Sequence, residues 1–210
     1  MKKILFCILL VFTILWSGFS QIKKEVKIGK QVWMTQNLNV DRFRNGDTIP
    51  EAKTNEEWIE AHYNEKPAWC YYNDDPANGV KYGKLYNWYA VVDPRGIAPA
   101  GWHVPSDIEF QNLKEFLGVF ESGIKKMFNP KDWTKFYCDG CTNSSGLTLL
   151  PSGMRYHRGE YSGIGFRGEW WSSTKHSEMH SYTRVLDDSF SFTSLDGDIR
   201  GGRSIRCVKD

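Results

Sequence analysis

The stretch from residue 82 to residue 105 constrains most strongly how this chain can fold. Its aromatic side chains need a core or a ligand to cover them: Tyr82, Tyr86, Trp88, Tyr89 and Trp102. Pro105 disfavours the helical conformation at Val104, so the stretch ends extended. Ser106 and Glu109 then have the spacing of a capping box, in which each side chain accepts a hydrogen bond from the other residue's backbone amide. We therefore expect an aromatic core segment that leads directly into a helix.

The first 20 residues have the three parts of a secretory signal peptide. Two lysines precede the apolar residues 4–15, and Gly18 and Ser20 are the small residues that a signal peptidase site requires. A retained membrane anchor is the alternative, but the apolar run is short for a span. We expect cleavage after Ser20, a single mature domain of residues 21–210, and a secreted, periplasmic or cell-surface location.

The charge balance argues against a nucleic-acid partner. Loss of residues 1–20 removes two lysines and leaves 25 basic residues against 25 acidic ones, so there is no basic excess to hold a phosphate backbone. The chain is instead rich in aromatic residues, with nine Trp, ten Tyr and twelve Phe, which build dense cores and stacking surfaces. We expect a monomer that is not a transmembrane protein and whose partner is a glycan or a protein.

Local signals predict an α+β fold. Thr54 and Glu57 have the spacing of a second capping box ahead of a helix at residues 58–63, and the apolar residues 85–92 predict a helix that Asp93-Pro94 ends. The third helix, residues 106–117, has apolar residues three and four apart: Ile108, Phe110, Leu113, Phe116 and Leu117. Runs typical of strands are 26–28, 31–34, 37–40, 68–72, 146–153, 161–166, 169–173, 182–186, 190–192 and 204–208.

Several motifs, in a fixed order, connect the chain to a known family. They occupy residues 69–79, 82–86, 101–106, 150–155, 170–174 and 204–210. In this order they closely resemble the Fibrobacter succinogenes major paralogous domain family of exported bacterial proteins, roughly over residues 32–210. The resemblance implies a C-type-lectin-like fold, close to the formylglycine-generating (sulfatase-modifying) group. In that fold two or three helices flank irregular antiparallel sheets, and the N- and C-terminal strands meet.

Four cysteines remain after cleavage, an even number that suggests two disulfides in an exported protein. Cys138 and Cys141 are close in sequence, and the Asp-Gly between them suits a tight turn, so we expect these two to pair. Half of a zinc site is the alternative, but a second Cys-x-x-Cys and a suitably spaced His pair are both missing. The family resemblance implies the other pair, Cys70 with Cys207, because the two strands that carry them lie together in the family.

Two acidic loops are candidates for binding calcium. Their carboxylates are Asp74, Asp75, Asp196 and Asp198. Calcium needs six or more converging oxygens, whereas turns capped by these side chains explain each cluster equally well. We therefore expect no cofactor, with calcium as the alternative. His176 and His180 would suit zinc only on a helix, and their Ser- and Thr-rich surroundings predict a loop.

The candidates for ligand contact are aromatic and guanidinium side chains in the strand-rich half: Trp171, Tyr156, Arg155 and Tyr182. Trp170 precedes Trp171, and because side chains alternate along a strand, at least one of these rings belongs to the core. The sequence lacks both the Gly-x-Ser-x-Gly motif of hydrolases and a phosphate-binding Walker loop. We expect a non-catalytic binding or adhesion module for glycan or protein. The alternative is a relative of the formylglycine-generating enzymes with oxidase-type cysteine chemistry.

The export hypothesis predicts the N-terminus of the mature protein. Because residues 1–20 combine a charged, an apolar and a small-residue region, the exported chain should begin at Gln21. Intact-mass analysis of protein from the culture medium or the periplasm measures this directly. A mass that still includes Met1 would contradict the hypothesis.

Overall fold

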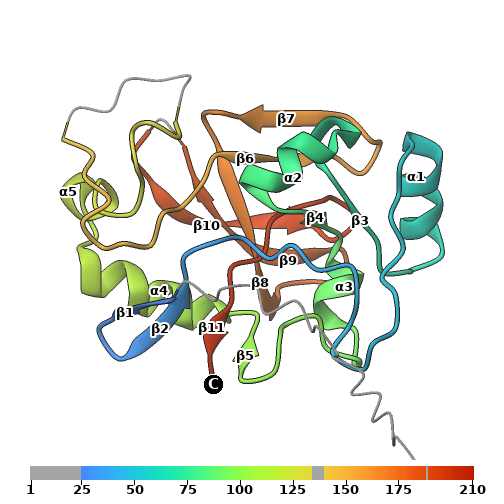
Figure 1. Ribbon diagram of the computed structural model, residues 1–210, viewed down its shortest axis with the longest axis horizontal. Coiled ribbons are helices and arrows are strands. Elements are labelled where there is room, and N and C mark those ends of the chain that lie inside the picture. The colour runs from blue at the N-terminus through green and yellow to red at the C-terminus, as the bar shows by residue number, and fades with distance from the viewer. Residues whose placement is uncertain (1–24, 134–139, 188) are drawn as a thin grey trace, which may run out of the picture.

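The computed structural model describes residues 25–133, 140–187 and 189–210 (Figure 1). Its helices are α1 (Asn55–Tyr63), α2 (Pro76–Tyr82), α3 (Trp88–Val92), α4 (Asp107–Leu117) and α5 (Glu121–Ile124), with a 3-10 turn, η1 (Tyr72–Asp74), before α2. Its strands are β1 (Glu25–Ile28), β2 (Gln31–Met34), β3 (Trp69–Cys70), β4 (Leu85–Tyr86), β5 (Trp102–His103), β6 (Ser152–Arg155), β7 (Tyr161–Ile164), β8 (Gly168–Lys175), β9 (His180–Leu186), β10 (Phe192–Asp198) and β11 (Val208–Lys209). The α+β prediction is confirmed.

The expected signal peptide, residues 1–20, lies outside the described residues. In the part of the chain that the structure describes, no helix combines the length and the apolar character that crossing a membrane requires.

The strands form two larger sheets and one short pair (Figure 1). A four-stranded sheet has the order β1-β2-β11-β5, and a five-stranded sheet has the order β10-β9-β8-β6-β7. Strands β8, β9 and β10 make the expected antiparallel meander, whereas β6 lies parallel to β8. Strands from near the two ends of the chain meet where Val208 of β11 pairs with Trp33 of β2.

Thr54 and Ser106 both cap helices as predicted, but the reciprocal capping box forms at Ser106 and not at Thr54, where the Glu57 carboxylate accepts from the Lys53 amide instead. The Thr54 side chain accepts a hydrogen bond from the Glu57 amide at the start of α1. At α4 the box is complete, since Ser106 accepts from the Glu109 amide while the Glu109 carboxylate accepts from the Ser106 amide. The predicted helix at residues 85–92 is shorter than expected. Residues 85 and 86 form strand β4, which pairs with β3, and Asn87 caps a helix that begins at Trp88.

Helices α2 and α5 were not predicted. At α2 the Asp75 carboxylate caps the helix by accepting from the Ala77 amide, and Pro76 occupies the first helical turn. Proline is well suited to that position because it lacks an amide hydrogen and already has helical φ. The same Asp-Pro dipeptide is equally typical of a turn, so the sequence alone does not distinguish the two.

Residues 201–208 form the centre of the molecule, and all eight are buried. This central segment (residues 201–208) makes backbone hydrogen bonds to several separate parts of the chain. Its partners are Met34, Leu38, Tyr86, Arg155 and the β8 residues Glu169 and Trp171. The segment therefore joins the two larger sheets and the short β3–β4 pair into one structure.

The central segment carries cationic side chains into the interior. Arg206 is fully buried and donates to the carbonyl oxygens of Met34, Leu147 and Thr148. Arg203 donates to the buried Glu169 carboxylate over 2.7 Å. Burying a guanidinium is costly unless its donors find acceptors, and although Arg206 Nε has no partner among the described residues, the other contacts favour one register of the segment in the fold.

Candidate functional site

Helix α4 has two apolar faces, and only one of them is buried. Phe110, Leu113 and Leu117 are buried beneath the helix, where each such side chain contributes about 1.5–3 kcal/mol of folding free energy. Ile108 and Phe116 belong to the same predicted stripe, yet each is 65% exposed. The five apolar residues of the predicted stripe are therefore not all buried. They extend over too much of the helix circumference for one contact with the rest of the protein to cover them.

Two more exposed apolar residues follow α4. Val119 and Phe120 follow the C-cap residue Gly118, and Phe120 is 79% exposed. Exposed apolar side chains that gather on one face of a protein mark a surface at which a partner binds. We call Ile108, Phe116, Val119 and Phe120 the exposed α4 face.

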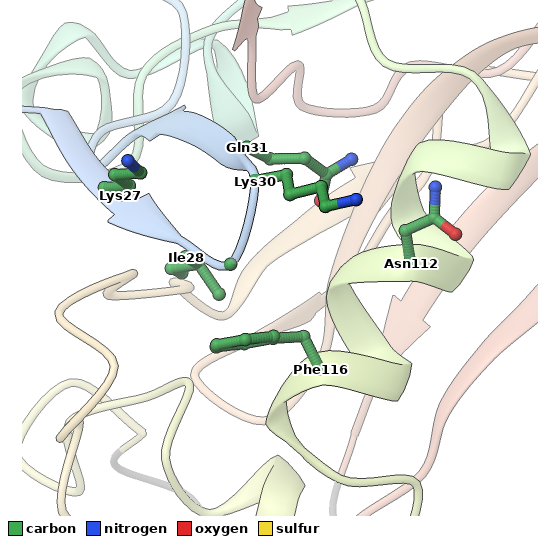
Figure 2. Close-up of a pocket in the computed structure, with 7 residues that line it drawn as sticks. Lys27, Ile28, Lys30, Gln31, Asn112 and Phe116 are labelled. Carbon is green, nitrogen blue, oxygen red and sulfur yellow. The ribbon is translucent and has the colours of Figure 1, made fainter.

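A groove opens between this helix and the β1–β2 hairpin (Figure 2). Its volume is about 780 Å³, and it is lined by Lys27, Ile28, Gly29, Lys30, Gln31, Asn112 and Phe116. In Figure 2 the Phe116 ring extends from the helix toward the hairpin near Ile28, while Asn112 stands one turn away. This volume lies within the range of ordinary ligand pockets.

The hairpin turn fits the helix because of a glycine. Gly29 has φ of +59°, a conformation that L-residues with side chains rarely adopt. A Cβ atom at this position would also lie 2.8 Å from the Phe116 ring, closer than carbon atoms approach. Glycine therefore permits both the tight two-residue turn and the approach of the Phe116 ring.

The wall of the groove is held by polar contacts at the start of α4. The Gln31 side chain donates to the Glu109 carbonyl over 3.0 Å, which ties the hairpin to the helix. Arg184, itself buried, donates to the Asp107 carboxylate over 2.8 Å. These contacts fix the position of α4, and therefore of the exposed α4 face, relative to the hairpin and the sheet.

His103 adds a charged contact to the same helix start. Its ring nitrogens lie 2.8 Å from Glu109 Oε1 and 2.7 Å from Asp210 Oδ1. Burial lowers the pKa of His103, but the hydrogen bonds and charges of these two carboxylates outweigh burial, and the net pKa is raised. The imidazole thus links β5, α4 and the residue that follows β11.

The groove is positively charged at its hairpin side. Lys27 and Lys30 are exposed, and among the described residues neither ammonium group forms an ion pair. Glu25, at the start of β1, pairs instead with Lys209 over 3.1 Å. An exposed apolar face beside two uncompensated cations is the arrangement that distinguishes this surface.

Two of the four predicted ligand contacts lie in the interior. Trp171 is fully buried and donates through Nε1 to the Tyr86 carbonyl over 2.7 Å. Arg155 is also fully buried, and its guanidinium donates to the carbonyl oxygens of Ala52, Thr54 and Gly159. Neither side chain has surface with which to contact a ligand in this structure, and both hold the fold together instead.

The other two predicted contacts reach the surface. Tyr156 is exposed in the turn that follows β6, and Tyr182 of β9 stacks on His176 with ring centroids 4.8 Å apart. Neither lines the groove beside α4. Their role as ligand contacts remains a proposal.

The calcium candidates are occupied by other partners. Asp74 accepts from the Tyr161 hydroxyl, and Asp75 caps α2. Asp196 lies 2.6 Å from His176, and Asp198 accepts from Arg200 through both carboxylate oxygens. Within residues 25–133, 140–187 and 189–210, no three His, Cys, Asp or Glu side chains are grouped to hold a metal.

The predicted bond between Cys70 and Cys207 is wrong, because both residues are buried free thiols. Cys70 packs with Trp58 and Leu85, whereas Cys207 belongs to a different apolar cluster around Tyr86. Burial raises the pKa of the Cys70 thiol to about 11 and that of Cys207 to about 12. Cys138 lies outside the described residues, so its pairing with Cys141 stays a prediction.

Comparison with known proteins decides the family. A model of the Fibrobacter succinogenes major domain matches residues 26–209. The chain belongs to this family. No curated protein and no solved structure matches the chain. The match includes the hairpin, α4 and the central segment (residues 201–208), so the groove is formed by residues of the Fibrobacter succinogenes major domain itself.

The Arg155 contacts generate a stability prediction for this Fibrobacter succinogenes major domain. Replacing Arg155→Lys keeps the charge but removes the planar donor fork, leaving buried carbonyl oxygens without partners. We expect the free energy of unfolding to fall by about 2–4 kcal/mol in chemical denaturation. The matched control is Arg158→Lys, since Arg158 is exposed and should change stability by less than about 0.5 kcal/mol. Equal effects of the two substitutions would refute the structural role of Arg155.

The buried thiols generate a second prediction. Because only the thiolate reacts, and burial raises both pKa values, Cys70 and Cys207 should resist alkylation by iodoacetamide in the native protein at about pH 8. Both should be labelled after unfolding in guanidinium chloride, as peptide mass spectrometry would show. Labelling of either residue in the folded protein would contradict its buried placement.

Proposed function

We propose that this chain is a non-catalytic binding module whose ligand is a protein that docks on the exposed α4 face. The observation that carries the proposal is the pair of exposed side chains on this helix, Ile108 and Phe116, together with the groove of about 780 Å³ that Phe116 lines. Leaving them in water forgoes the free energy that their burial would contribute, and a docked partner would recover it.

A protein ligand fits the groove better than a glycan. Sugar binding relies on aromatic platforms together with many planar hydrogen-bonding groups, and the groove offers one ring, Phe116. Of its two amide side chains, Gln31 already donates to Glu109, which leaves Asn112 as the amide that can contact a ligand. The lining is otherwise aliphatic or cationic, which suits an apolar anchor residue from a protein.

The enzymatic alternative has less support. Cysteine chemistry of the formylglycine-generating kind needs a reactive thiolate that substrate can reach. Cys70 and Cys207 are buried, and burial raises the pKa of each thiol well above neutral. We therefore favour binding over catalysis.

The remaining parts of the proposal concern location, assembly and fold. We infer export from the apolar residues 4–15, and a monomer at the periplasm or cell surface. A C-type-lectin-like arrangement is supported by the pairing of β2 with β11, which brings strands from near both ends of the chain together.

In-cell crosslinking tests the proposed function. With photoreactive benzoylphenylalanine at Asn112, in the groove, illumination of the producing cells should yield a discrete adduct with a protein. A second substitution, Phe116→Asp, should remove the adduct while leaving the melting temperature nearly unchanged, because Phe116 is exposed.

The matched control for this experiment is Val80, which is 90% exposed and lies outside the groove. Benzoylphenylalanine at position 80 should give no such adduct, and Val80→Asp should leave the adduct at position 112 intact. Identical adducts from both positions, or none from position 112, would overturn the proposal.

A further inference from the structure

The surroundings of the exposed α4 face indicate the chemistry of its partner, an inference that rests on the proposed function. Lys27 and Lys30 both line the groove, on either side of the Ile28–Gly29 turn (Figure 2). Among the described residues, neither lysine has a carboxylate partner, and the nearby Glu25 is already paired with Lys209. The hairpin side of the groove thus has two positive charges available to a ligand.

The helix side contributes no compensating carboxylate to the groove. The acidic residues of α4 are committed elsewhere: Asp107 accepts from Arg184, and Glu109 accepts from Ser106 and contacts His103. Glu115 accepts from Gln111 and does not line the groove. The charged side chains that line the groove are therefore both cationic and lie beside apolar ones, although the mature chain as a whole is balanced in charge.

The exposed α4 face also limits the size of what binds. Ile108 and Phe116 are eight residues apart on the helix, which corresponds to about 12 Å. A partner segment of about two helical turns, or about four extended residues, spans that distance. A single apolar anchor beside Phe116 and Ile28, with carboxylates within reach of the lysines, would match this surface.

We propose that the groove between α4 and the β1–β2 hairpin binds an acidic amphipathic peptide segment of a partner protein. Its apolar residue packs on Phe116, and its carboxylates pair with Lys27 and Lys30. Opposite charge speeds encounter and selects among partners, while the apolar anchor supplies most of the affinity. A basic segment would be repelled by the two lysines, and a purely apolar segment would leave them without a charged partner.

Selection from a random peptide phage library on the immobilised mature domain tests this proposal. The enriched peptides should combine Asp or Glu with a large apolar residue, and their synthetic versions should bind the domain in solution. Phe116→Asp should weaken that binding at least about 30-fold, as loss of a central anchor does. Val80→Asp should not change it.

Charge reversal separates the partner's chemistry from the existence of the site. Lys27→Glu with Lys30→Glu should weaken the acidic peptides roughly tenfold, and raising the salt from about 50 to 500 mM should weaken them comparably. The matched control reverses two exposed lysines outside the groove, Lys66→Glu with Lys131→Glu, and should have little effect.

The outcomes of these experiments separate the existence of the binding site from the chemistry of its partner. Peptides that depend on Phe116 but are neutral or basic would overturn the acidic partner and leave the proposed function standing. A selection without any Phe116-dependent peptide would overturn both. A dimer in analytical ultracentrifugation that Phe116→Asp dissociates would assign the face to a second copy of this chain and overturn the inference.

Discussion

The structure depends on the burial of the central segment (residues 201–208). Its backbone is hydrogen-bonded to segments as far apart in sequence as Met34 and Trp171, so none of these regions can reach its native environment without it. The same segment carries Arg203 and Arg206 inside, where Arg203 donates to Glu169 and the terminal nitrogens of Arg206 donate to carbonyl oxygens. Removing one partner from such a network leaves a charge stranded in the interior, which makes alternative registers of this segment costly. Residues adjacent in the fold are therefore mostly distant in sequence.

The sheet that contains the end of this central segment buries one face of α4. Val208 of β11 pairs with Trp33 of β2 and His103 of β5, and α4 lies against the sheet that these strands form, with Phe110 in contact with Trp33. The helix start is held by the capping box at Ser106 and by the ion pair between Asp107 and Arg184. One face of the helix is thus fully used by the fold. The exposed face holds Ile108 and Phe116, beside a hairpin whose two lysines have no ion-pair partner in the part of the chain that the structure describes.

The sequence predicted local features well and long-range ones poorly. The side-chain caps at Thr54 and Ser106 depend only on neighbouring residues, and both begin helices. The disulfide of Cys70 with Cys207 was wrong, because the pairing depends on where two strands over a hundred residues apart are placed. The groove was missed for a related reason: a stripe that includes Ile108 and Phe116 shows how much of a helix is apolar, but not how much of it the rest of the chain covers. The signal that could have found it was the width of that stripe.

The central claim is that one apolar face of α4 is buried by the fold while the other is available to a partner. Hydroxyl-radical footprinting of the purified mature protein, read by peptide mass spectrometry, measures the solvent exposure of each side chain directly. The account predicts rapid oxidation of Phe116 and Phe120, and protection of Phe110 until the protein unfolds. If Phe116 and Phe120 were protected as well as Phe110 in the isolated monomer, the exposed α4 face would not exist, and the proposed binding site would be contradicted.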